Sequence, residues 1–190
     1  NKKRLTQHQR FKKLELNEKN ILELYKLSKK VNIDFAVTPF DISFIKFLSK
    51  HITFFKIASG DVDFVPLLEE ISKYNRPVIV STGLSDIKRI KIATKILKKN
   101  KLILMHCIAS YPTKISEVNL NSIRYLQKKF ELEVGFSDHT PGFTAALMSL
   151  GLGVRIIEKH FLPNNNIRNV GDYELSLNPK NFGKFRKLVN

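Results

Sequence analysis

The stretch Leu132–Thr140, LEVGFSDHT, carries the pattern that decides the fold. A short apolar run over residues 132–136 is followed at once by polar side chains, among them Ser137 and His139. Such a run is typical of a buried strand, and its polar residues fall at the carboxyl end. In α/β barrels the functional groups gather at that end of the parallel strands. The stretch therefore predicts a strand that delivers side chains to a site.

The same pattern recurs along the chain. Strands are expected at residues 33–37, 53–57, 77–80, 102–105, 132–136 and 154–157. Helices are expected at residues 42–50, 65–74, 85–99, 121–130, 143–152 and 179–189, and an earlier helix follows Asn17, a plausible N-cap. The strands begin about 20 to 30 residues apart, which is the span of a βα unit.

Two α/β architectures compete for this pattern, an open doubly wound sheet and a closed barrel. No glycine-rich G-x-G-x-x-G turn follows the first strand, and polar residues end all the expected strands rather than one switch point. We therefore predict an α/β protein of the TIM (β/α)₈-barrel type, incomplete, with about six βα units. It is a single partial barrel domain over residues 1–190, with a polar segment at 1–16 and βα units from 17. Because a full barrel has eight units, two are expected upstream.

Composition narrows the class of protein. The net charge of +16 invites a nucleic-acid interpretation, but the lysines lie in pairs on expected helix faces and no nucleic-acid-binding motif accompanies them. We expect solvated helix faces, with nucleic-acid binding as the lesser alternative. No apolar run is long enough for a membrane span, and no secretion signal opens the chain. Cys107 is the only cysteine, which fits a reducing compartment and a cytoplasmic location.

Six segments at the expected strand ends resemble the sialic acid synthase family in order and spacing. They are residues 34–41 (DFAVTPFD), 55–61 (FKIASGD), 80–83 (VSTG), 106–113 (HCIASYPT), 135–140 (GFSDHT) and 158–161 (EKHF). Gly171-Asp172 corresponds to a Gly-Pro-Asp of the family without its proline, and Ala109 stands where relatives often have Ser or Asn. The resemblance runs from about residue 11 to the end of the chain.

The resemblance implies an activity. Enzymes of the family condense phosphoenolpyruvate with an N-acylated amino sugar, giving a nonulosonic acid and phosphate, and they use a divalent cation, Mn²⁺ or Mg²⁺. N-acetylmannosamine and a 2,4-diacetamido-trideoxyhexose are both open as the sugar, with a homodimer expected for the full-length enzyme. A pseudaminic acid or spore-coat polysaccharide synthase relative, or an inactive fragment, is the alternative.

The resemblance also assigns residues. It makes His139 and His160 metal ligands, and Asp61 and Asp172 catalytic carboxylates. It gives substrate-binding roles to Thr38, Lys56, Ser59, Ser81, Tyr111 and Ser137. Simpler interpretations stay open: core histidines, strand-end caps for the hydroxyls, loop packing for the tyrosine and a helix cap for Asp61.

Strand alternation assigns directions near the last of these segments. It places Glu158 and His160 on one side and Lys159 on the other. We expect Glu158 to orient its neighbours and Lys159 to act either at the site or as a structural ion-pair partner.

Overall fold

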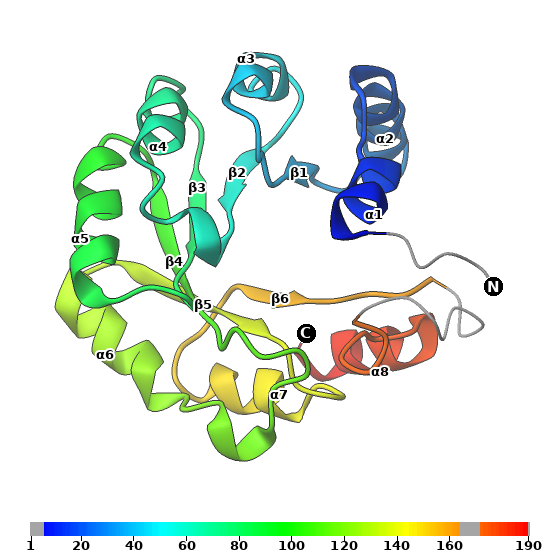
Figure 1. Cartoon of the computed structure of the whole chain (residues 1–190). Helices are drawn as coiled ribbons and strands as arrows, with labels where there is room; N and C mark the ends of the chain where they lie inside the picture. Colours follow the sequence, from blue (N-terminus) through cyan, green and yellow to red (C-terminus); the bar gives the residue numbers. More distant parts are fainter. Residues whose placement is uncertain (1–5, 164–171, 190) are drawn as a thin grey trace.

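A computed structural model describes residues 6–163 and 172–189. Its described residues contain a six-stranded sheet in the order β1-β2-β3-β4-β5-β6, with every neighbouring pair parallel. The strands are β1 (Ala36–Val37), β2 (Phe54–Ile57), β3 (Val78–Ser81), β4 (Leu102–His106), β5 (Glu133–Asp138) and β6 (Ile157–Lys159). The sheet curves into half of a barrel with helices on its outer side (Figure 1). The predicted α/β fold of barrel type with six βα units is confirmed.

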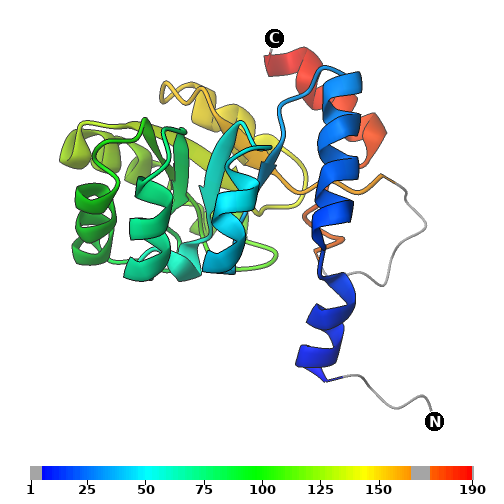
Figure 2. The same cartoon turned by 90° about the horizontal axis from the view of Figure 1, so that it is seen from above.

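Helices alternate with these strands. The α-helices are α1 (Gln7–Leu14), α2 (Glu18–Lys30), α3 (Ile45–Leu48), α4 (Val65–Ser72), α5 (Ile87–Ile96), α6 (Asn121–Phe130), α7 (Thr144–Leu150) and α8 (Pro179–Val189). Short 3₁₀ helices are η1 (Ile42–Phe44), η2 (Ser59–Asp61) and η3 (Ile115–Glu117). Seen from above, α1 and α2 stand end to end beside the sheet (Figure 2). No helix in the described ranges combines the length and apolar character needed to cross a membrane.

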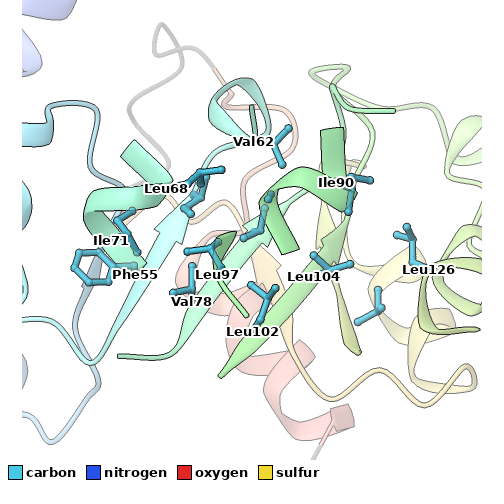
Figure 3. Packing of buried hydrophobic residues seen from close by; sticks show 14 of the residues in the cluster. Phe55, Val62, Leu68, Ile71, Val78, Ile90, Leu97, Leu102, Leu104 and Leu126 are labelled. Carbon is cyan, nitrogen blue, oxygen red and sulfur yellow. The ribbon is translucent and has the colours of Figure 1, made fainter. Parts of the chain in front are cut away.

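The main core lies between the outer face of the sheet and the helices. Phe55, Val78 and Leu104 point outward from β2, β3 and β4 and pack against helix residues such as Leu68 and Ile90 (Figure 3). Side chains two residues apart share a face of a strand, so this outer packing leaves the alternate residues for the inside of the half-barrel. Helix α8 packs separately, because Phe185 joins Ala146 of α7 and Leu177 in a second cluster.

Local signals located some helix ends, whereas the helices expected at 65–74, 85–99 and 143–152 are shorter than predicted, and the one expected at 42–50 is divided between η1 and α3. Asn17 caps α2 through its side chain, Asp86 caps α5, and α6 and α8 have the predicted bounds. Helix α1 was not predicted, although Thr6 and Gln9 form its capping box.

The strand boundaries differ from the prediction, by a single residue in β2 and β4 and by more elsewhere. The last strand was expected at 154–157 and lies at Ile157–Lys159, so that prediction is wrong: the strand begins and ends two to three residues later along the chain. Strands β3 and β5 both run further into polar sequence than expected, to Ser81 and Asp138. Strand β1 is shorter, with two residues, because it has only β2 as a partner in the described sheet.

Candidate active site

Two layers of side chains fill the inner face of the half-barrel. The lower layer is apolar and consists of Ile79, Ile103 and Met105, with Phe54 and Ile156 packed against them. Two residues further along these strands and β5, toward their carboxyl ends, the inward positions become polar or small. The upper layer contains Lys56, Ser81, Cys107, Ser137 and Glu158. The polar upper layer therefore packs directly against the apolar lower layer.

Lys56 is the cation of this layer, and its side chain is 13% exposed. Its Nζ donates to Ser81 Oγ at 2.7 Å and pairs with Glu158 Oε2 at 3.2 Å. A buried ammonium in an apolar strand needs such partners to offset its lost hydration. The partners come from β3 and β6, so one side chain ties together three strands of the half-barrel.

Glu158 continues the chain of contacts toward the histidines. Its Oε1 accepts a hydrogen bond from Ser137 Oγ at 2.7 Å, and Ser137 Oγ lies 3.3 Å from His139 Nε2. Ser137 and Glu158 are also direct cross-strand partners of β5 and β6. The residues Ser81, Lys56, Glu158 and Ser137 thus form one continuous polar network, and His139 lies against its end.

The protonation of the His139 ring follows from its partners. Its Nδ1 lies 2.7 Å from the carbonyl oxygen of Ile108, which can only accept a hydrogen bond, so the proton sits on Nδ1. In the neutral ring Nε2 then presents its lone pair on the side where Ser137 lies. Because the hydroxyl proton of Ser137 goes to Glu158, the 3.3 Å approach of Ser137 Oγ to Nε2 is a close contact without a hydrogen bond. The ring is held further by its backbone, since Thr113 N donates to His139 O at 2.9 Å.

His160 and Tyr111 complete this end of the site. The ring of His160 lies 5.5 Å from that of His139, centroid to centroid. The Tyr111 ring lies 4.2 Å from that of His139, tilted against it, and 5.9 Å from that of His160, edge-on. Asp172 Oδ2 lies 3.7 Å from His160 Nδ1. Burial lowers the pKa of His160, although the Asp172 carboxylate opposes that shift, so the neutral imidazole is favoured.

A smaller cluster surrounds Cys107 beside Lys56. Burial raises the pKa of the Cys107 thiol, and the backbone of Gly83 and Thr82, the Lys56 charge and a Ser59 hydrogen bond counteract it. A Cβ on Gly83 would stand 2.8 Å from Cys107 Sγ, so only glycine fits there. Ser59, predicted to bind substrate, therefore lies next to the Lys56 end of the network.

Thr38 and Asp61 stand apart from the network. No hydrogen bond or ion pair joins either side chain to it among the residues that the structure describes. Burial raises the pKa of Asp61, and the charge of Asp63 adds to the effect. Asp61 lies within η2, and no side chain caps α4, so the helix-cap interpretation of Asp61 is wrong.

The remaining predicted site residues therefore meet at one place: Lys56, Ser59, Ser81, Tyr111, Ser137, His139, His160 and Asp172. Glu158 was expected only to orient its neighbours, yet it joins the two halves of the network. Cys107 also borders the site, beside Lys56 and Ser59. A signal for Glu158 was present: a lysine within an apolar strand requires a counter-charge, and Glu158 shares the face of His160.

The histidines were also tested as a cation site. In the described parts of the chain no group of three or more His, Cys, Asp or Glu side chains is arranged to hold a metal ion. The imidazole rings of His139 and His160 nevertheless lie face to edge, and imidazole nitrogen is a common ligand of divalent transition metals. The donor set fits a cation held by two protein ligands, with its other positions left to ligands from outside the chain.

Comparison with known proteins places the chain. The model of the NeuB family matches residues 1–190. The chain belongs to the NeuB family. An uncharacterised protein of Methanocaldococcus jannaschii is 45% identical over 95% of this chain and 53% of its own length. The N,N'-diacetyllegionaminic acid synthase of Campylobacter jejuni is 39% identical over 92% of this chain and 54% of its own length.

Solved structures agree with this membership of the NeuB family. The N-acetylneuraminic acid synthetase of Leptospira borgpetersenii, in complex with citrate, superposes with a TM-score of 0.87 and 35% identity, over 92% of this chain and 62% of that one. A truncated 3-deoxy-D-arabino-heptulosonate 7-phosphate synthase of Thermotoga maritima, 16% identical with a TM-score of 0.74, shares the fold. The chain spans about half the length of the curated relatives that it matches. Several relatives are named as synthases of legionaminic acid, pseudaminic acid or N-acetylneuraminate 9-phosphate.

Proposed function

We propose that the protein condenses phosphoenolpyruvate with an N-acyl amino sugar to give a nonulosonic acid and phosphate. One observation carries the proposal: a polar network runs from the ammonium of Lys56 through Glu158 to Ser137, whose hydroxyl oxygen lies 3.3 Å from His139 Nε2. It lies at the carboxyl ends of parallel strands, where barrel enzymes have their sites. Relatives named as legionaminic and pseudaminic acid synthases support the reaction class.

The Lys56 end of the network is suited to an anion. An ammonium has three N–H donors, and two of those on Lys56 point to Ser81 and Glu158, so a third is left for a ligand oxygen. Charge-assisted hydrogen bonds to carboxylate or phosphate are about twice as strong as neutral ones. We assign the anionic groups of phosphoenolpyruvate to Lys56, Ser59, Ser81 and Ser137, with Thr38 as a more distant contact.

The histidine end is suited to the aldehyde of the sugar. His139 and His160 would hold a divalent cation, Mn²⁺ or Mg²⁺, which supplies Lewis-acid polarisation of a carbonyl oxygen. His139 keeps its Nδ1 proton on the Ile108 carbonyl and so orients Nε2 into the site. The Tyr111 ring packs against both histidine rings.

The bonding changes define what the site must do. The electron pair of the C2=C3 double bond of phosphoenolpyruvate forms a bond from C3 to the aldehyde carbon, and the aldehyde oxygen takes up a proton to become a hydroxyl. Water adds its oxygen to C2 and gives up a proton, and the C2–O bond to the phosphate breaks as phosphate leaves. Lys56 and the serine hydroxyls stay on the anionic groups while charge moves, which is preorganised electrostatic stabilisation. Asp61 is a candidate proton carrier, because burial raises its pKa toward the range in which a carboxyl group can exchange protons. Asp172 is a candidate for binding sugar hydroxyls. The single, buried Cys107 fits a reducing compartment, so we place the reaction in the cytoplasm.

The test is phosphate release from phosphoenolpyruvate in the presence of Mn²⁺ and one sugar at a time. N-acetylmannosamine and 2,4-diacetamido-2,4,6-trideoxymannose are the two candidates, and the sugar that supports release names the substrate. We expect release to need the sugar, to stop with a chelator, and to fall by about 10² or more in His139→Ala and His160→Ala.

Lys73→Met is the matched control, because Lys73 forms an exposed ion pair with Glu70 far from the site. It should leave the rate unchanged. Wild-type turnover in both histidine variants would overturn the cation assignment. No release with either sugar, from folded protein supplied with Mn²⁺, would overturn the substrate class.

A further inference from the structure

Three residue pairs follow one another where β5 and β6 end, and the side chains of the middle pair point away from the site. Ser137 pairs with Glu158 in the site, and the next residues, Asp138 and Lys159, are also cross-strand partners. One residue further on, His139 and His160 face each other again in the site. The pair Asp138–Lys159 is thus enclosed in sequence by site residues but does not touch the site.

Lys159 makes three contacts that converge on the backbone around His139. Its Nζ donates to Asp138 O at 3.1 Å and to Thr140 O, and it pairs with Asp138 Oδ2 at 3.2 Å. The two carbonyls are those immediately before and after His139. Asp138 adds a fourth contact, since its Oδ1 accepts from Thr140 N at 2.8 Å. The ends of β5 and β6 are therefore tied together at the position of the histidines.

Burying the charged groups of Lys159 and Asp138 costs free energy, because both lose their hydration. The side chains of Lys159 and Asp138 are 2% and 0% exposed. A buried ion pair is weak evidence for stability, because a well-packed apolar pair of similar volume often does as well. An apolar pair would not fix the two carbonyls flanking His139, whereas an ammonium with three donors does so directionally.

We propose that Lys159 is a positioning residue that sets the spacing of His139 and His160. It holds the backbone on both sides of His139 while its own neighbour in the chain is His160, so one side chain determines where both rings stand. The expected effect on metal binding rests on the proposed cation site, whereas the positioning of the two rings does not depend on it. We call the contacts of Lys159 with Asp138 and Thr140 the clamp, and removing it should leave both rings present but misplaced. Replacing groups that support metal ligands commonly changes metal affinity by about 10- to 100-fold.

The test combines Mn²⁺ binding with nitrogen–proton NMR of the histidine rings. In wild type the Nδ1–H of His139 is bonded to Ile108 O and should give a protected ring signal. His106 is the internal control, because its Nε2 lies 2.8 Å from Val118 O, away from the clamp. In Lys159→Met we expect the His139 signal to broaden or shift, the His106 signal to stay, and Mn²⁺ affinity to fall by about 10- to 100-fold.

A second variant covers a failure to fold. Lys159→Met alone leaves the Asp138 carboxylate buried without its partner, whereas Asp138→Asn combined with Lys159→Met removes both charges and keeps an oxygen for Thr140 N. The double variant should show the same loss at His139. Lys73→Met is again the matched lysine control and should change neither readout.

The outcomes separate this proposal from the proposed function. An unchanged His139 signal and unchanged Mn²⁺ affinity in the double variant would overturn the clamp. Wild-type protein that binds no Mn²⁺, with the His139 signal still lost in the variants, would support the clamp and overturn the cation site. Loss of both the His139 and His106 signals in the folded double variant would also overturn the proposal, since the effect would then be general.

Discussion

Replacing Gly135 by alanine tests the close approach of two strands beneath the site. A Cβ at this position would meet Met105 Sδ from β4 and would stand 2.6 Å from the carbonyl oxygen of Ile156. That oxygen already accepts the Phe136 N–H at 2.9 Å, so it is fixed in place. The methyl group can fit only if the chain leading into β6 moves away from β5.

The size of the effect follows from what must move. Overpacking costs about 1–3 kcal/mol, and a backbone oxygen cannot turn aside as a side chain does, so we expect a loss of about 2–3 kcal/mol in Gly135→Ala. At an m-value of about 2 kcal/mol per molar urea, the unfolding midpoint falls by roughly 1 M or more. The same shift would displace Glu158 and His160 from their partners on β5, so Mn²⁺ binding should weaken in the folded variant.

Gly183 provides the matched control. It lies in α8, and nothing stands within 4 Å of the Cβ that alanine would add. Alanine is favoured over glycine in a helix by about 0.5–1 kcal/mol, so Gly183→Ala should raise the urea midpoint slightly. A Gly135→Ala midpoint within roughly 0.2 M of wild type would refute the close packing of β4, β5 and the start of β6.

Three further predictions concern single side chains. Burial lowers the pKa of His106 below its unfolded value of 6.5, so the unfolded state binds the proton more readily and stability is lost as pH falls. His106→Gln should therefore flatten the pH dependence of the unfolding free energy between about pH 7 and 5. An equal slope in both proteins would contradict this. Asp86→Ala removes the cap on Arg89 N and should cost about 1 kcal/mol in urea unfolding; no loss would mean that the cap is unimportant. Lys56→Met removes a charged donor worth about 1.5–3 kcal/mol, so kcat/KM for phosphoenolpyruvate should fall about 10- to 100-fold; an unchanged KM and kcat would exclude Lys56 from anion binding.

The sequence predicts most reliably the features that depend on neighbouring residues. The caps at Asn17 and Asp86 and the bounds of α6 and α8 follow from capping side chains and helical periodicity, which act within a few residues. The alternation of strands and helices also follows from local patterns, and it is sufficient to indicate a parallel sheet.

Features that depend on distant partners could not be predicted in the same way. Strand β6 begins at Ile157 and includes Glu158 and Lys159, because those charges find partners in other strands: Ser137, Lys56 and Asp138. Nothing near residue 158 in the sequence announces them. For the same reason Glu158 was not predicted to bind or react with substrate, although the need of Lys56 for a counter-charge was visible in the sequence.

The candidate site shows the same division. A resemblance in sequence placed the residues at strand ends, and the curvature of the sheet then brought the network and both histidines together. Thr38 and Asp61 also sit at strand ends but join no contact of the network among the described residues. Position in a motif indicates the correct end of the sheet, whereas the reach of each side chain decides whether it meets the others.

The most direct test of the proposed chemistry follows the bridging oxygen of phosphoenolpyruvate. The substrate is labelled with ¹⁸O between C2 and phosphorus, and it is incubated with Mn²⁺, the amino sugar and the protein before mass analysis of both products. If the network catalyses condensation with cleavage of the C2–O bond, the label appears in inorganic phosphate and is absent from a new sugar acid. Label retained at C2, or phosphate released without a sugar acid, would contradict the account.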